Sequence, residues 1–84
     1  MNPKPSLPQV LVLHEVADGT VWFDMVTGKW HTTYGRGDAS VQVDILHRNG
    51  YVNIVGDLIT LTPMGKQVLD RRPYAEVVEK LNGG

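Results

Sequence analysis

The order of three elements in the second half of the chain constrains its fold more than any other feature of the sequence. Residues 38–49 have the spacing of a short amphipathic helix that ends before a glycine. Residues 51–62 then favour a hairpin around Gly56-Asp57. Thr62 can cap a further helix that has Pro63 at its first position. The sequence therefore predicts a helix, a hairpin and a second helix around a common core.

The N-terminal part of the chain predicts an unusually apolar helix over residues 7–17. Ser6 can cap this helix, and Asp18-Gly19 ends it. Apolar side chains surround most of the helix, so it is either buried on two sides or covered by a partner. His14 lies on an apolar face, which predicts a packed core histidine.

Residues 20–34 alternate about Thr27-Gly28, which predicts a hairpin in which Val26 pairs with Lys29. The alternative is a short helix over residues 21–26. β-Branched and aromatic residues dominate that stretch and no helix cap precedes it, so the hairpin is preferred. One face of the hairpin, expected to join the core, then carries Val21, Phe23, Met25, Trp30, Thr32 and Tyr34, and the other carries Trp22, Asp24, Val26, Lys29, His31 and Thr33.

The helix over residues 38–49 is expected to be capped by Asp38 or Ser40. Its periodicity predicts a core-facing side and an outward side. The core side carries Ala39, Val43 and Leu46, and the outward side carries Val41, Asp44, Ile45 and Arg48.

Pro73 precedes a last amphipathic helix, which ends at residues 82–84. Its apolar stripe either packs on the core of its own domain or pairs with a second subunit, and the sequence leaves both open. The candidate dimerisation residues are Tyr74, Val77, Val78 and Leu81.

Residues 43–70 resemble the second half of a winged helix-turn-helix domain. Leu46 matches the buried leucine of this family, Asn49-Gly50-Tyr51-Val52 matches its helix stop and strand entry, and Leu61-Thr62-Pro63-Met64-Gly65 matches the start of the helix after the wing. The whole chain also resembles small winged-helix proteins of actinobacteria and their phages, in which a hairpin-like segment stands in place of the second helix.

This resemblance implies an α+β fold of the winged helix-turn-helix type. The expected parts are an N-terminal helix, a hairpin-like segment, a recognition-like helix, a β-wing and a C-terminal helical extension. The corresponding divisions are a flexible tail (1–6), a winged-helix domain (7–72) and a C-terminal amphipathic helix (73–84).

The resemblance also implies binding of double-stranded DNA through the recognition-like helix. The leading hypothesis is a small DNA-binding protein, a transcriptional regulator or accessory factor, with a phage origin left open. Residues 25–37 support it because they contain no acidic residue, whereas Asp44, the acidic wing turn and a net charge of −1 oppose it. The candidate nucleic-acid-binding residues are Lys29, His31, Arg36, Ser40, Val41, Gln42 and Arg48.

The alternative hypothesis is a winged-helix protein-interaction module, such as a phage product that binds and inhibits a host protein. Apolar side chains on outward faces suit a protein partner. The candidate protein-interaction residues are Trp22, Val26, Val41 and Ile45.

Other functional classes find no support in the sequence. The 84 residues suffice for one domain, contain no cysteine and have no apolar run that could cross a bilayer, so a cytoplasmic protein with no membrane partner is expected. The three histidines are scattered, and no spacing typical of a nucleophile with its base or of paired carboxylates occurs. We therefore expect neither an enzyme nor a protein with a metal ion or cofactor.

Overall fold

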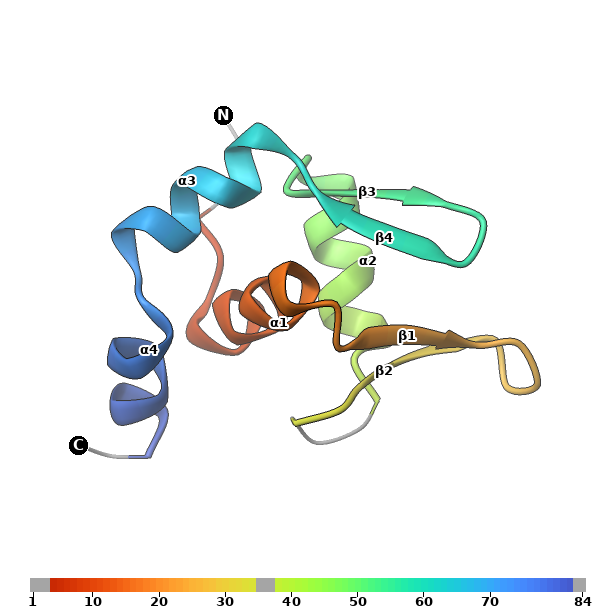
Figure 1. The fold of residues 1–84 in the computed structure, drawn as a ribbon, viewed down its shortest axis with the longest axis horizontal. Coiled ribbons are helices and arrows are strands. Elements are labelled where there is room, and N and C mark those ends of the chain that lie inside the picture. The colour runs from red at the N-terminus through yellow and green to blue at the C-terminus, as the bar shows by residue number, and fades with distance from the viewer. Residues whose placement is uncertain (1–3, 35–37, 83–84) are drawn as a thin grey trace.

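The computed structural model describes residues 4–34 and 38–82 of the chain. Within them the fold is α+β, with four helices and two antiparallel two-stranded hairpins (Figure 1). This confirms the predicted class, and the element order is compatible with a winged-helix-like layout. The elements are α1 (Leu7–Asp18), β1 (Val21–Asp24), β2 (Lys29–Thr32), α2 (Ser40–Arg48), β3 (Val52–Val55), β4 (Leu58–Leu61), α3 (Pro63–Arg71) and α4 (Tyr74–Leu81).

α1 lies at the centre, in contact with the other three helices and with β1 and β4 (Figure 1). Val10 and Leu13 are fully buried, so of the two alternatives left open for this helix the structure shows burial against other elements of its own chain. Ser6 caps the helix as predicted, because its hydroxyl group accepts the N–H of Gln9 while the Gln9 side chain accepts the N–H of Ser6. Residues 1–3 of the predicted tail lie outside the described residues.

The hairpin between α1 and α2 forms as predicted, but with a different register. Asp24 pairs with Lys29 and Phe23 with Trp30, so the predicted pairing of Val26 with Lys29 is wrong. The cause is the Asp24 carboxylate, which accepts the N–H groups of Val26 and Thr27 and closes a longer turn over residues 25–28.

The shift in register is two residues, and it therefore keeps the side chains of the paired strands on their predicted faces. Val21, Trp30 and Thr32 are buried, as expected for the core face. Met25 and Tyr34 were predicted on this face too, and both are exposed because they lie beyond the paired strands.

α2 buries the predicted side, with Ala39, Val43 and Leu46 in the core. Its predicted caps are wrong, because the N-cap residue is Ala39. The Asp38 carboxylate accepts the N–H of Ser40, just before the helix, and the Ser40 hydroxyl group accepts the N–H of Trp30. The bond between Ser40 and Trp30 ties the start of α2 to β2.

The second hairpin and its junction with α3 follow the prediction. β3 and β4 pair around a Gly56-Asp57 turn. Thr62 caps α3 by accepting the N–H of Gly65, and the Thr62 hydroxyl group also donates to the carbonyl oxygen of Gly50. Gly65 lies against the carbonyl group of Tyr51, where a Cβ atom would overlap with it. The sequence that joins β4 to α3 therefore fixes how this junction packs.

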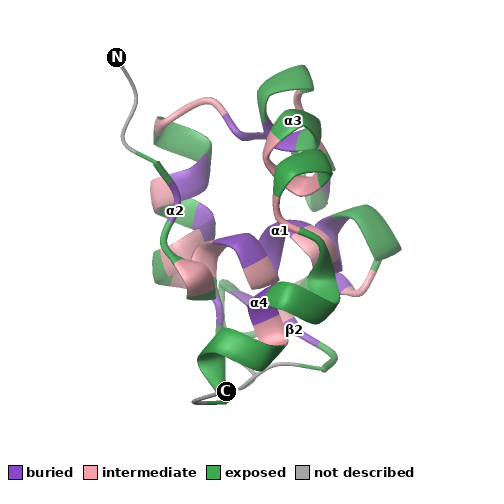
Figure 2. Cartoon of the chain, turned by 90° about the vertical axis from the view of Figure 1, so that its left-hand side faces the viewer, coloured by how far each residue is buried: buried purple, intermediate pink, exposed green. Residues whose placement is uncertain are grey.

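α4 packs on α1 of its own chain (Figure 2). Val77 is buried to 1% exposure, whereas Tyr74 and Leu81 stay partly open. His14 is packed, as the sequence predicted, but it is only partly buried and lies outside the core cluster. Its Nε2 lies 2.7 Å from the carbonyl oxygen of Arg72, and its ring meets the Tyr74 ring edge-on. No helix among the described residues is long and apolar enough to span a bilayer.

Candidate macromolecule-binding surface

The predicted nucleic-acid-binding residues cluster on β2 and α2, which adjoin each other. Arg36 lies outside the described residues. The others are Lys29 and His31 on β2, and Ser40, Val41, Gln42 and Arg48 on α2.

Both described lysine and arginine side chains of this set are paired with carboxylates. Lys29 Nζ lies 3.8 Å from Asp38, and an Arg48 guanidinium nitrogen lies 3.2 Å from Asp44, one helical turn away. All four side chains are more than half exposed, so solvent screens these pairs and they add little to the stability of the fold. Each pair nevertheless places a carboxylate beside a cation that the DNA hypothesis assigns to phosphate.

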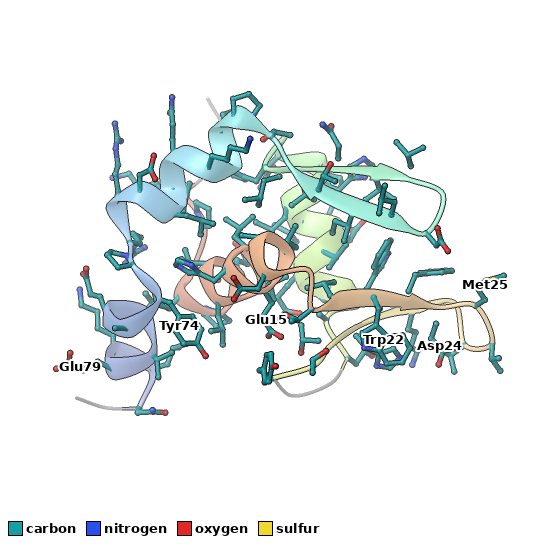
Figure 3. All side chains as sticks on the ribbon, viewed as in Figure 1. Glu15, Trp22, Asp24, Met25, Tyr74 and Glu79 are labelled. Atoms are coloured by element: carbon teal, nitrogen blue, oxygen red, sulfur yellow. The ribbon has the colours of Figure 1, made fainter. Side chains whose placement is uncertain are left out.

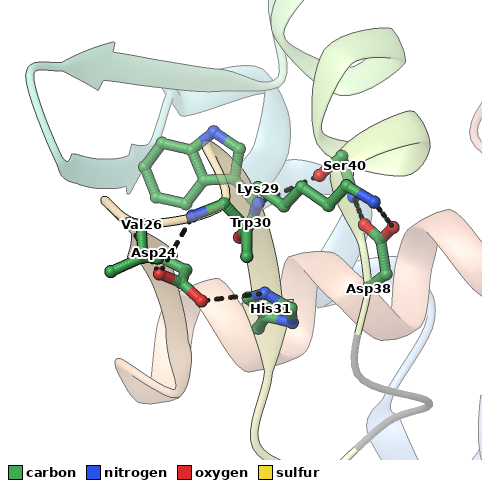
Figure 4. A network of polar contacts seen from close by, with 8 residues as sticks. Asp24, Val26, Lys29, Trp30, His31, Asp38 and Ser40 are labelled. Atoms are coloured by element: carbon green, nitrogen blue, oxygen red, sulfur yellow. Dashed lines mark hydrogen bonds and ion pairs between the residues drawn. The ribbon is translucent and has the colours of Figure 1, made fainter.

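His31 is held within the hairpin. Its ring stacks on Trp22 with centroids 4.8 Å apart. Its Nε2 lies 3.8 Å from an Asp24 oxygen (Figure 4). This nitrogen is buried and has no hydrogen-bond partner among the described residues. The His31 ring therefore packs against its own hairpin and does not project freely into solvent.

Two carboxylates beside these groups are stabilised in their ionised form. The backbone N–H of Val26 lowers the pKa of Asp24 below its usual value, with the nearby His31 a smaller contribution. The N–H of Ser40 lowers the pKa of Asp38, with Lys29 acting in the same direction. Both acids therefore stay negatively charged at neutral pH on the surface that was expected to meet DNA.

Four large apolar side chains lie at the turn ends of the two hairpins. We call this set of four side chains the hairpin ends. The hairpins project from the same side of the core, and β1 contacts β4 (Figure 1). None of the four belongs to the core cluster. They are Met25, Val26, Val55 and Leu58, exposed to 79%, 95%, 77% and 63%.

The predicted protein-interaction residues are divided between two elements. Val26 belongs to the hairpin ends, and Trp22 lies half exposed on the outer face of β1 (Figure 3). Val41 is exposed on the first turn of α2, whereas Ile45 is partly buried. The prediction therefore found two exposed residues of the β1–β2 hairpin, Trp22 and Val26, but not the other exposed residues of the hairpin ends.

The sequence reasoning missed Met25, Val55 and Leu58 as surface residues. Val55 and Leu58 flank the two-residue turn of their hairpin, and this position beside the turn is the signal that places them at its end. Glu15 was missed as well. It is 2% exposed, and its Oε1 accepts the Thr20 hydroxyl group and the N–H of Tyr34, so it anchors the end of β2 to α1.

The stripe proposed for dimerisation is partly used within the chain. Val77 is buried against its own domain, and Val78 is partly buried. Tyr74 and Leu81 retain exposed surface at the end opposite to the hairpins (Figures 1 and 3). A contact of this stripe with a second subunit would therefore rest chiefly on Tyr74 and Leu81.

No group of His, Asp or Glu side chains among the described residues could hold a metal ion. Comparison with protein-family models, with curated proteins and with solved structures finds no match. The function is therefore inferred from the residues and their geometry.

Proposed function

We propose that this chain is a winged-helix-like protein-interaction module whose hairpin ends bind a partner protein. The observation that carries the proposal is the exposure of Met25, Val26, Val55 and Leu58 at the turn ends of two hairpins that project from the same side of the core (Figure 1). Isolated apolar residues are common on protein surfaces, but neighbouring ones mark interaction sites. The core does not use these four side chains, so folding alone does not account for their apolar character.

The charges around the hairpin ends favour a protein over a phosphate-bearing partner. Asp24 adjoins Met25, and Asp57 lies in the turn between Val55 and Leu58. Carboxylates repel the phosphates of DNA and of anionic lipids. A protein surface with an apolar depression flanked by basic side chains is complementary to this arrangement.

Affinity capture from the source cells, followed by direct titration of the purified captured protein, tests this proposal. Wild type should bind, and Val26→Asp and Leu58→Asp should each weaken binding by roughly tenfold or more, because they place a charge in an apolar contact. Val41→Asp is the matched control, since it makes the same change on an exposed apolar residue of α2.

The proposal fails if the captured protein binds the two hairpin variants as tightly as it binds wild type. It also fails if only Val41→Asp weakens binding, because that result would place the interface on α2. Amide NMR spectra should show that all three variants keep the fold.

DNA binding through α2 is the second proposal. The observation that favours it is that α2 precedes the β3–β4 hairpin, as a recognition helix precedes a wing, and exposes Val41 and Arg48. The exposed pair of Arg48 with Asp44 is weak enough for a DNA phosphate to displace the carboxylate.

An amide NMR titration with random-sequence duplex DNA at low salt separates the two proposals. DNA binding predicts salt-sensitive shifts at residues 38–48 and their loss in Arg48→Ala. Lys80→Ala, which removes another helical cation paired with a glutamate one turn away, is the control. The absence of shifts along α2 would leave the protein-interaction proposal alone.

A further inference from the structure

A groove of about 530 Å³ lies between α3 and the segment that precedes α1. Three of its lining residues are cations, and none of the described residues that line it is acidic. They are Lys4, Arg71 and Arg72. The groove is distinct from the hairpin ends and shares no residue with the candidate surface on β2 and α2.

Both walls of the groove are fixed by the fold. On one wall, Gln67 and Arg71 stand one turn apart on α3, and Arg72 follows directly. The Arg72 backbone is held at both ends, since its N–H donates to the carbonyl oxygen of Val68 and its carbonyl oxygen lies 2.7 Å from His14 Nε2. On the other wall, Lys4 precedes the buried Pro5.

The charges of the groove are not neutralised within the described part of the chain. The ion pairs found there engage Lys29, His31, Arg48 and Lys80, and none engages a cation of the groove. Asp70, next to Arg71 in the sequence, lines a different groove together with Lys66 and takes part in none of these ion pairs. Like charges that line one groove without an ion-paired carboxylate repel one another, and a bound anion reduces this repulsion.

We propose that this groove binds a phosphate group. Guanidinium groups donate two parallel hydrogen bonds to phosphate oxygens, and the Lys4 ammonium group adds a third charge. The Gln67 amide is a further donor on the same wall. Val68 and Met64 add apolar lining beside the cations. The phosphate belongs either to a small phosphorylated molecule or to a DNA backbone.

The test is an amide NMR titration of the whole chain with inorganic phosphate, and in a second arm with random-sequence duplex DNA. Potassium chloride at matched ionic strength serves as the reference. Saturable shifts are expected at Lys4 and at residues 67–72. The double variant Arg71→Gln/Arg72→Gln should weaken binding roughly ten- to a hundredfold, since each arginine donates charge-assisted hydrogen bonds.

Lys66→Gln is the matched control, because it removes one cation from the same helix outside this groove. It should bind phosphate like wild type. If the double variant does not give a folded spectrum, the single variants Lys4→Gln and Arg71→Gln, at exposed positions, replace it.

Binding in both arms supports a phosphate site. Binding in the phosphate arm alone supports it too, and assigns the groove to small phosphorylated molecules, because DNA then produces no shift there. Binding in the DNA arm alone assigns the groove to backbone phosphate. Shifts that chloride reproduces, shifts that miss the groove, or equal weakening by Lys66→Gln overturn the proposal. The hairpin-end variants test the proposed protein interaction separately, so either idea can fail alone.

Discussion

The hydroxyl group of Thr62 lies 2.6 Å from the carbonyl oxygen of Gly50 and so joins the start of α3 to the end of α2. The Thr62 hydroxyl oxygen also accepts the N–H of Gly65, and the Thr62 N–H donates to the carbonyl oxygen of Tyr51. One residue thereby closes the β3–β4 hairpin onto two helices.

Replacing Thr62 with valine should therefore destabilise the fold by about 1–3 kcal/mol, because the helix loses its cap and the Gly50 carbonyl group loses a donor. Urea denaturation would measure the change. Thr60→Val, on the exposed side of β4, should stay within about 0.5 kcal/mol of wild type. Equal effects of the two variants would mean that the Thr62 contacts are not stabilising.

Gly65→Ala should also destabilise the fold, although alanine favours helices by about 1 kcal/mol over glycine. The added Cβ atom would overlap with the Tyr51 carbonyl oxygen, and overpacking typically costs about 1–3 kcal/mol. Thermal unfolding followed by circular dichroism would show a lower midpoint. Lys66→Ala, at the next and exposed position, should leave the midpoint nearly unchanged. A stabilised Gly65→Ala variant would contradict the close approach of α3 to Tyr51.

Much of this junction was predictable from the sequence, because caps and turns depend on residues a few positions apart. Ser6, Thr62 and the Gly56-Asp57 turn act as predicted. The register of the β1–β2 hairpin was not predictable from alternation alone, because a shift of two residues preserves both faces. The bonds from Asp24 to the turn decide it.

The candidate sites were less predictable, because they depend on residues far apart in the sequence. Lys4 lines a groove with Arg71 and Arg72 only after α3 folds back along the N-terminal segment. The pairing of Lys29 with Asp38 needs the contact between β2 and the start of α2. The pairing of Arg48 with Asp44 follows helical spacing and could have been inferred.

Asp24 should titrate below the usual aspartate value of 3.8, chiefly because its carboxylate accepts the N–H of Val26. A lowered pKa in the folded state means that the ionised carboxylate stabilises the turn above the usual value, and that this contribution is lost as the pH falls through the lower, folded-state pKa. Carboxyl NMR titration would give the pKa, and the Val26 amide shift should follow the same curve. In Thr27→Val both backbone N–H donors stay while the smaller contribution of the Thr27 hydroxyl group is lost, so the pKa should remain lowered. An unshifted or raised Asp24 pKa in wild type would contradict the bond.

Glu15→Leu should weaken the anchor between α1 and the end of β2. Leucine is apolar and can stay buried, but it leaves the N–H of Tyr34 without its acceptor. The free energy of unfolding should therefore fall by about 1–3 kcal/mol. Hydrogen exchange at the Tyr34 amide should become faster. Glu15→Gln keeps a side-chain oxygen and should retain most of the protection. Unchanged exchange in Glu15→Leu would show that the bond does not hold this segment.

Val77→Ala should destabilise the chain by about 1–3 kcal/mol, because it removes buried methyl groups from the contact between α4 and the rest of the domain. If α4 packs on α1 of its own chain, the loss should be the same at every protein concentration. If α4 instead pairs with a second subunit, the unfolding midpoint of wild type should rise with protein concentration, and that of the variant should rise less. Urea denaturation at several concentrations separates the two cases.

Leu81→Ala, at a partly exposed position of the same helix, should have a smaller effect. A concentration-dependent midpoint that Leu81→Ala abolishes would show that the open end of the stripe forms a dimer contact in addition to the intramolecular packing of Val77.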